Sequence, residues 1–530
     1  MYNGFSETCT GEICSNPLCY RCILSDRKRD LQMFIQKKIL KTCGADPSFH
    51  LKYENLPVGL KNLGATCYMN TVLQCLYFTP SFKQHIYSVE VKENTLFQLQ
   101  KMYASLQYGI RKDYDPKAFA DSLNLTTGIQ QDVQEFFLLF LSYLEGIDER
   151  LKKMVNELFL GVQVYENFCS VCNWKSEGVS NFQQLSVHLD GNSIEECMDQ
   201  SFCKVEQLFD FPCPDCKNTS VGRRGKIKNL PTILNIHLMR FVYDPSLHAK
   251  YKVHKKISFG KTLDLSTVYE GGSPGEPDCL YTLYSVICHY GETANSGHYV
   301  AFVLEEGATT SSWNFFDDIS VKKYSSFPFP LPAGTQLTPY ILMYKKQQFK
   351  EDKSGAHTAP KELVESIQRE SEQFLDDIKK FKFTSNLIKD KLEAGYLQYR
   401  EVYANLAPVD EKYYWINAVW LKKWCRQEEP ISEPINNSEI LCEHDKLSFN
   451  LNKMKKISKL AWAYFVENYG GGPVFTKGSA CRECALDFWD RAKALAGKFE
   501  IKASLTKACK KKPSIFKDND LLHFYASREW

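Results

Sequence analysis

The feature that most limits how this chain can fold is a change of hydrophobic period within residues 57–346. In the first half of this stretch apolar residues recur every three to four positions, as in QQDVQEFFLLFLSYL, which predicts helices with a buried face. In the second half, segments such as LPTILNIHLMRF and GHYVAFVLEE are rich in β-branched and aromatic residues, which predicts strands. Helices followed by strands predict an α+β domain over residues 57–346.

The rest of the chain divides into further segments by composition. Residues 1–50 form an N-terminal segment that carries cysteines. Residues 350–408 are rich in charge and poor in aromatic residues, which predicts an exposed, charged helical linker. Aromatic residues return over 409–498, which predicts a second, smaller domain. The aromatic order in LLHFYASREW echoes that domain, so residues 513–530 predict the start of a second, truncated copy, and the chain would then be a fragment or a short isoform.

The charge and hydropathy patterns argue against several classes of partner. A net charge of +3, from 66 basic and 63 acidic residues, gives no field of one sign that would favour nucleic acid or an anionic membrane. No segment approaches the roughly 18 to 20 consecutive apolar residues of a membrane span, and the first residues lack the order of a signal peptide. We therefore expect an intracellular protein, in the nucleus or cytoplasm, whose 20 cysteines are reduced.

One cysteine has the local sequence of a nucleophile. Cys67 follows a Gly-Ala-Thr turn in GLKNLGATCYMN and directly precedes an apolar stretch that predicts a buried helix. A helix N-terminus supplies partial positive charge and unpaired N–H groups, which stabilise a thiolate. The alternative is a small packing residue, as we expect Cys75 to be. Asn62 can donate its amide to an oxyanion, with the Cys67 backbone N–H as second donor, or be only a turn residue.

A base for this thiol is available far downstream. His298 follows Ser-Gly on a tight turn that leads into a predicted strand, and Asp317 and Asp318 come after the next predicted strand, in WNFFDD. An acid that returns beside the imidazole would fix its tautomer and stabilise its charged form. The alternative is a structural histidine, which is the role we expect for His289. The order cysteine, histidine, acid is that of papain-like thiol hydrolases.

These motifs resemble those of a known family. GLKNLGATCYMN resembles the Cys box, and YGETANSGHYVAF with WNFFDD resembles the His box, of the ubiquitin-specific proteases; QQDVQEF and LPTILNIHLMRF are similar to signatures between the two boxes. The resemblance covers nearly all of 57–346 and implies a papain-like fold of fingers, palm and thumb. It implies Cys67 as nucleophile, His298 as general base and then acid, Asp317 as orienting acid assisted by Asp318, and Asn62 in the oxyanion hole.

The activity that the resemblance implies is that of a deubiquitinating thiol protease. Such an enzyme cleaves the isopeptide or peptide bond after the C-terminal glycine of ubiquitin through a thioester, so ubiquitin and ubiquitinated proteins are the implied partners. Two alternatives stay open: a non-catalytic ubiquitin-binding scaffold, and a protease for a ubiquitin-like modifier.

An acidic pair is a candidate contact for the substrate tail, which the family implies to be arginine-rich before two glycines. Asp132 and Glu135 lie three apart in QQDVQEFF, so on a helix they would share one face and could both meet guanidinium groups. The alternative is an ordinary solvated helix face.

Two C-x-x-C pairs, in NFCSVCNW and FPCPDCKN, predict a metal site within a zinc-ribbon insertion at residues 160–218. Each pair suits a tight knuckle that presents two thiolates, and four thiolates complete a closed tetrahedral site for a structural Zn²⁺. A redox pair would need a βαβ setting that the sequence does not predict. The resemblance makes this site the tip of the fingers that hold ubiquitin. The predicted ligands are Cys169, Cys172, Cys213 and Cys216.

Two other cysteine groups have less regular spacing. The candidates for zinc binding are Cys9, Cys14, Cys19 and Cys22 near the N-terminus and, if the fold brings them together, Cys442, His444, Cys481 and Cys484 in the small domain. The small domain, with YYWINAVWLKKWC and AWAYFVENYGGGPVF, is similar to the DUSP domain of several of these proteases, which implies a small α/β fold and protein partners for it.

Overall fold

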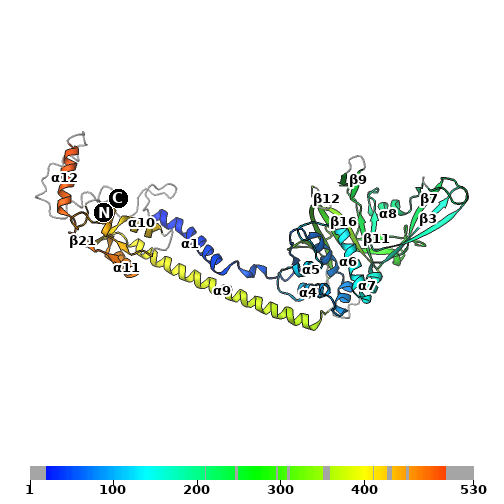
Figure 1. Cartoon of the computed structure of the whole chain (residues 1–530), viewed down its shortest axis with the longest axis horizontal. Coiled ribbons are helices and arrows are strands. Elements are labelled where there is room, and N and C mark those ends of the chain that lie inside the picture. The colour runs from blue at the N-terminus through cyan, green and yellow to red at the C-terminus, as the bar shows by residue number, and fades with distance from the viewer. Residues whose placement is uncertain are drawn as a thin grey trace. The chain divides into compact units, whose positions relative to one another are not determined.

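The computed structural model (Figure 1) describes residues 20–208, 211–244, 249–293, 296–306, 311–332, 334–349, 358–409, 411–426, 432–448 and 453–496. The chain divides into two compact units, one of Asp46–Lys379 and one of Met1–Ala45 with Lys380–Trp530. Residues 513–530 and three of the N-terminal cysteines lie outside the described residues, and of Cys22 only the backbone is described, in α1 (Tyr20–Cys43).

The first half of the larger unit is a helical layer. Its helices are α2 (Cys67–Tyr77), α3 (Pro80–Ser88), α4 (Asn94–Tyr108), α5 (Lys117–Ser122), α6 (Val133–Ile147) and α7 (Glu149–Phe159), with the short parallel strands β1 (Gly59–Leu60) and β2 (Asp113–Tyr114). Helix α2 lies in the middle of the core and is buried from Cys67 to Leu76. Its Tyr68 ring packs edge-on against Phe136 of α6, with 5.2 Å between ring centroids.

The second half is an eight-stranded sheet in the order β15-β14-β13-β12-β16-β8-β5, with β11 paired to β12. The strands are β5 (Leu185–Val187), β8 (Ile233–Leu238), β11 (Thr262–Asp264), β12 (Leu280–Thr293), β13 (Ser296–Glu306), β14 (Ser311–Asp317), β15 (Ser320–Tyr324) and β16 (Thr338–Lys346). Along β13 alternate residues enter two different cores: Tyr299 and Ala301 join the core shared with the helices, and Val300 and Phe302 join the core on the other side of the sheet. Because both faces are buried, this strand is apolar without alternation.

A smaller sheet carries the two C-x-x-C pairs. Its order is β4-β3-β7-β6, from β3 (Gly161–Cys169), β4 (Lys175–Phe182), β6 (Glu206–Gln207) and β7 (Val221–Asn229). Helix α8 (Ile194–Phe202) and the hairpin of β9 (Phe241–Asp244) and β10 (Ala249–Lys252) complete this unit. The predicted α+β class with an inserted cysteine cluster is therefore confirmed.

Helix α9 (Lys361–Ala404) covers the predicted linker, but the expectation that it is exposed is wrong at both of its ends. Leu363 and Ile367 belong to the core of the larger unit, and Tyr399 and Tyr403 belong to a core of the smaller unit. Phe383, between them, is 73% exposed. The buried residues lie three or four positions apart, so a narrow apolar stripe was concealed by the charges around it.

The smaller unit is built on a three-stranded sheet in the order β19-β17-β21. Its elements are β17 (Tyr413–Asn417), α10 (Ala418–Arg426), β18 (Ile435–Asn436), β19 (Met454–Ser458), α11 (Lys459–Tyr469), β20 (Gly471–Gly472), β21 (Phe475–Thr476) and α12 (Arg482–Ala496). Its main core is aromatic, with Trp420 and Trp424 packed edge-on against Phe465. Among the helices that the structure describes, none combines the length and apolarity that crossing a membrane requires.

Candidate active site and metal-binding clusters

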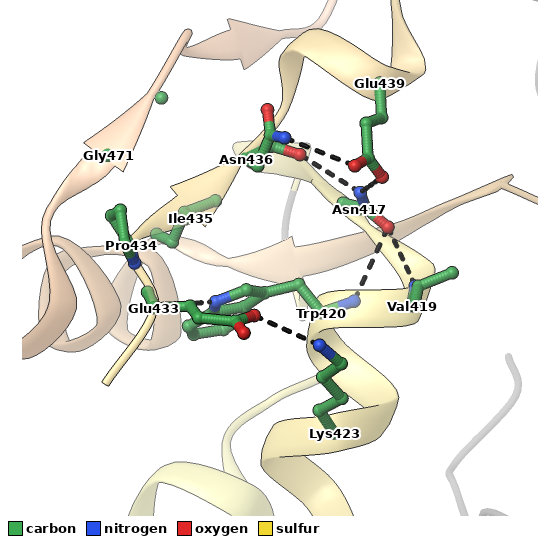
Figure 2. A pocket seen from close by; sticks show the side chains of 11 residues that line it. Asn417, Val419, Trp420, Lys423, Glu433, Pro434, Ile435, Asn436, Glu439 and Gly471 are labelled. Carbon is green, nitrogen blue, oxygen red and sulfur yellow. Dashed lines mark hydrogen bonds and ion pairs between the residues drawn. The ribbon is translucent and has the colours of Figure 1, made fainter. Parts of the chain in front are cut away.

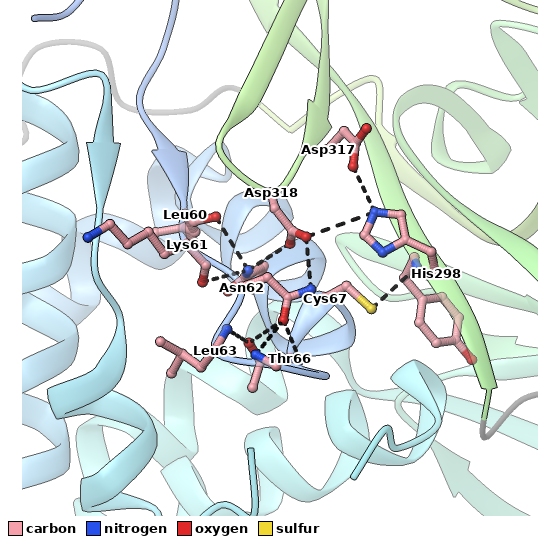
Figure 3. Close-up of polar contacts among 12 residues, drawn as sticks. Leu60, Lys61, Asn62, Leu63, Thr66, Cys67, His298, Asp317 and Asp318 are labelled. Atoms are coloured by element: carbon pink, nitrogen blue, oxygen red, sulfur yellow. Dashed lines mark hydrogen bonds and ion pairs between the residues drawn. The ribbon is translucent and has the colours of Figure 1, made fainter. Parts of the chain in front are cut away.

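Cys67 is the first residue of α2 and is 1% exposed. The preceding loop is folded around Asn62, whose side-chain oxygen accepts hydrogen bonds from the backbone N–H groups of Gly64 and Thr66, both at 3.0 Å. The thiol reaches the sheet, since the backbone N–H of Tyr299 in β13 donates to its Sγ at 3.4 Å (Figure 3). Cys67 therefore lies at a helix N-terminus, where a thiolate is stabilised, and against the strand that carries His298.

The structure brings His298 and Asp317 to this thiol. Nε2 of His298 lies 2.7 Å from Oδ1 of Asp317 and 3.9 Å from Oδ2 of Asp318 (Figure 3). With Nε2 directed at the carboxylates, Nδ1 is the nitrogen that remains for the thiol. The hydrogen bond with Cys67 and, after it, the bond with Asp317 raise the pKa of His298 to about 9, although burial opposes this shift. The imidazole is therefore held in its charged form at neutral pH.

Asp318 joins the segment before α2 to the end of β14. Its Oδ2 accepts from Nδ2 of Asn62 at 2.9 Å and its Oδ1 accepts from Nδ2 of Asn70 at 2.8 Å. Its backbone oxygen accepts from the N–H of Leu60 at 3.1 Å. The side chain of Asp318 is 14% exposed; its contact with the buried Asn70 is partly shielded from water, whereas its contact with Asn62 is at the surface. Asn62, the predicted oxyanion donor, thus donates one of its two amide N–H groups to Asp318.

Asn70 was not among the site residues that the sequence indicated. It is 3% exposed, and besides Asp318 it donates to the backbone oxygen of Lys61 at 3.1 Å. The available signal was an amide side chain three residues after Cys67 in a helix that is otherwise buried and largely apolar. A buried polar side chain of this kind requires partners, which are found here in the site itself.

His289 lies on β12, the neighbour of the strand that carries His298, and is fully buried as a structural residue. Its Nδ1 lies 3.0 Å from Nζ of Lys252, which also donates to the backbone oxygen of Gly291 at 2.7 Å. Burial lowers the pKa of His289 to about 3 and that of Lys252 to about 8. A neutral His289 ring thus accepts from a lysine that holds β10 against the end of β12. Sequence reasoning missed Lys252, because KYKVHKK has the appearance of ordinary surface charge.

The acidic pair lies at the start of α6. Asp132 is the N-cap of α6 rather than a residue of the helix face: its carboxylate accepts from the N–H of Gln134 at 2.8 Å and from the hydroxyl of Tyr340 at 2.8 Å. Glu135 lies in the first turn and is exposed. The cap position therefore gives Asp132 partners within the fold, and contact of this pair with a substrate tail stays a prediction.

The four cysteines of the two C-x-x-C pairs are gathered at the end of the smaller sheet. Sγ of Cys169 lies 3.6 Å from that of Cys216, and Sγ of Cys172 lies 3.5 Å from that of Cys213. All four sulfurs lie within 4.8 Å of one another. A tetrahedral ion with metal–sulfur bonds of about 2.3 Å places sulfurs about 3.8 Å apart, so this group could hold a metal such as zinc. A second group, Cys442, His444, Cys481 and Cys484, is also gathered within 4.8 Å in the smaller unit.

The smaller unit also has a polar pocket of about 480 Å³ (Figure 2). Lys423 and Glu433 form an ion pair at one side, with 3.0 Å between nitrogen and oxygen, and Asn417 and Asn436 both bond to Glu439 at the other. The indole of Trp420 lies between these two groups. Both signs of charge are therefore present at its rim.

Two protein-family descriptions match parts of this chain. The family described as ubiquitin carboxyl-terminal hydrolase matches residues 58–344, and the chain belongs to this family. The DUSP domain matches residues 410–479.

Among individual relatives, the chain is similar to ubiquitin carboxyl-terminal hydrolase 48 of Danio rerio, with 32% identity over 83% of this chain and 46% of that protein. It is also similar to ubiquitin carboxyl-terminal hydrolase 26 of Arabidopsis thaliana, with 29% identity over 85% of this chain and 48% of that protein. The chain spans about half the length of the curated relatives it matches.

Proposed function

We propose that this chain is a cysteine-type deubiquitinase with Cys67 as its nucleophile. The observation that carries the proposal is the meeting of Cys67, at the N-terminus of α2, with His298 and Asp317 on two neighbouring strands. Cys67 comes from one segment, and His298 and Asp317 come from another that lies more than 200 residues later in the sequence. Together the three side chains have the contacts of a nucleophile, its base and the acid that orients the base. The family match and the names of the relatives support ubiquitin as the substrate.

In the proposed mechanism, the Cys67 thiolate attacks the carbonyl carbon of the C-terminal glycine of ubiquitin. The oxyanion that forms accepts from the backbone N–H of Cys67 and from the second amide N–H of Asn62. His298 then protonates the leaving lysine amine as the C–N bond breaks, which leaves a thioester. Water, deprotonated by His298, attacks the thioester and releases ubiquitin and the thiolate.

The deciding test is release of a fluorophore from the C-terminus of ubiquitin by the purified chain. Hydrolysis that requires Cys67 supports the proposal. Binding of ubiquitin without hydrolysis would support the scaffold alternative instead, and cleavage only of a fluorophore joined to a ubiquitin-like modifier would support the third alternative.

We further propose that Cys169, Cys172, Cys213 and Cys216 bind a structural Zn²⁺. Both knuckles have the same backbone: the residue after the second cysteine, Asn173 or Lys217, is left-handed, with φ of 61° and 62°. Four thiolates leave no open position for water, so the ion would stabilise the end of this sheet and take no part in the hydrolysis.

For the DUSP domain we propose protein partners, which the domain match supports. For the chain we propose a place in the nucleus or cytoplasm.

The pH dependence of hydrolysis should follow the charge on His298. Its pKa is raised to about 9, so the imidazolium that protonates the leaving amine is present below this pH and is lost above it. In Asp317→Asn the carboxylate that stabilises the charged form is gone, so we expect the alkaline limb of kcat/KM to move to lower pH and kcat to fall. An unchanged limb would contradict this role of Asp317. Asp121→Asn, which removes an exposed carboxylate paired with Lys117 at 2.9 Å, should leave the profile unaltered.

Contact with the substrate tail is best tested at Glu135, because Asp132 also caps α6 and binds Tyr340. Glu135→Arg should raise KM for ubiquitin substrates by about tenfold, equivalent to ~1.4 kcal/mol. We expect kcat to change little, because residue 135 would contact the tail of the bound substrate and not the reacting atoms. Glu149→Arg is the matched control, since Glu149 is an exposed acid in the first turn of α7. Equal KM values for the two variants would exclude Glu135 from the tail site.

A further inference from the structure

A second group of side chains that could hold a metal ion lies in the smaller unit, and its role does not depend on the proposed hydrolysis. We propose that Cys442, His444, Cys481 and Cys484 bind a structural Zn²⁺ that fastens the start of α12 to the loop after β18. The DUSP match ends at residue 479, so two of the four ligands lie beyond it.

The distances fit one tetrahedral ion. Nδ1 of His444 lies 3.5 Å from Sγ of Cys481, 3.5 Å from Sγ of Cys484 and 3.8 Å from Sγ of Cys442. With bonds of about 2.3 Å to sulfur and 2.0 to 2.1 Å to nitrogen, a tetrahedral zinc places these atoms about 3.6 Å apart. Three thiolates and one imidazole form a closed ligand set of the kind found in structural zinc sites.

The histidine is held in the tautomer that such a site needs. Nε2 of His444 lies 2.9 Å from Oε2 of Glu483, which favours the ring proton on Nε2 and leaves a lone pair on Nδ1, the nitrogen that lies near the three sulfurs. A carboxylate on the far nitrogen of a ligating histidine fixes the orientation of the ring and increases its basicity. Glu483 has this relation to His444, although the two residues lie on separate segments.

The turn of Cys442 repeats the knuckles of the other cluster with one residue fewer. In the first pair the N–H of Asn173 donates to the backbone oxygen of Cys169 at 3.2 Å, and Asn173 has φ of 61°. In the small unit the N–H of Asp445 donates to the backbone oxygen of Cys442 at 3.0 Å, and Asp445 has φ of 51°. A C-x-H sequence is one residue shorter than C-x-x-C, so the same turn closes around the shorter pair.

Backbone pairing brings the other two ligands to this turn. The N–H of Cys481 donates to the oxygen of Leu447 at 3.0 Å, and the N–H of Leu447 donates to the oxygen of Ser479 at 3.1 Å. Cys481 directly precedes α12 and Cys484 lies in its first turn, where the helix terminus favours thiolates. The ligands are thus positioned by main-chain contacts, and the adjacent core is small, a situation in which a metal commonly supplies stability.

The test is the zinc content of the full chain, measured by mass spectrometry of the elements. The double variant C481S/C484S should contain about one zinc per chain fewer than the wild type, and C169S/C172S should lose a different one, so the two losses should add. Cys425→Ser removes a buried thiol of the same unit that is not in the cluster, and should leave the zinc content unchanged. An unchanged zinc content in C481S/C484S, or a disulfide between Cys481 and Cys484 in the native chain, would overturn the proposal.

A conservative variant covers the case in which the double variant does not fold. His444→Cys should keep the zinc, and after exchange for Co²⁺ the thiolate-to-cobalt absorption of the chain should increase by about one seventh, because the two clusters together then offer eight sulfurs in place of seven. The same absorption in His444→Cys and in the wild type would show that position 444 is not a ligand.

Discussion

Cys67→Ala is expected to abolish hydrolysis of ubiquitin conjugates, lowering kcat by about 10⁴-fold or more, while ubiquitin binding is retained. In the proposed mechanism the variant lacks the sulfur atom that forms the thioester, and no neighbouring group in the described site can replace it. The surface of the protein that would bind ubiquitin should be unaffected, because the side chain of Cys67 is 1% exposed. The measurements are fluorophore release from ubiquitin and calorimetric titration with ubiquitin.

Cys75→Ala is the matched control for this prediction. Cys75 lies on the same helix and is fully buried, with Sγ 2.9 Å from the hydroxyl of Ser285, and burial raises its pKa to about 12. It therefore remains a thiol at neutral pH, and its loss should reduce stability by roughly 1 to 2 kcal/mol without reducing kcat. Activity in Cys67→Ala would refute the assigned nucleophile, and inactivity of both variants would indicate a packing effect.

The sequence could indicate Cys67, His298 and Asp317 because each lies at the junction of two recognisable local patterns. A change from turn to apolar helix marks the cysteine, and a change from turn to strand marks the histidine. Asn70 and Lys252 gave no comparable signal, since their importance comes from partners that are distant in sequence. Local patterns predict elements, whereas buried polar partners depend on how those elements pack.

The group of Cys442, His444, Cys481 and Cys484 likewise depends on packing and not on a local sequence pattern. The spacing between Cys442 and Cys481 carries no information about a shared ion, because the main-chain pairing of Leu447 with Ser479 and Cys481 is what brings the two segments together. The C-x-x-C pairs at Cys169 and Cys213 could be predicted, since each forms its knuckle within a few residues.

Asp318→Ala is expected to have the second largest effect, a fall in kcat of about 10²-fold together with a loss of ~2 to 3 kcal/mol of stability. The stability loss arises because the amide donors of Asn62 and Asn70 lose their acceptor, and Asn70 is 3% exposed. The rate loss follows from displacement of the loop before Cys67 relative to His298, since misplacement by about 1 Å has this cost. Unfolding by urea and single-turnover kinetics measure the two effects.

A reciprocal exchange, N62D/D318N, separates the two proposed roles of Asn62, which are to hold the loop before Cys67 and to donate a hydrogen bond to the oxyanion. An aspartate at 62 still accepts from the N–H groups of Gly64 and Thr66, and an asparagine at 318 can accept from Asn70 while donating to residue 62, so every hydrogen bond of this network has a replacement. Asparagine also tolerates the φ of 49° at this position. Stability should therefore return toward that of the wild type.

The rate of this exchanged variant shows whether Asn62 acts on the substrate. A carboxylate at 62 has no N–H to donate and would repel an oxyanion, so kcat should stay at least about 10²-fold below the wild type even when stability is restored. Recovery of both stability and kcat would mean that Asn62 only positions the loop before Cys67, and that the backbone N–H of Cys67 serves the oxyanion without it.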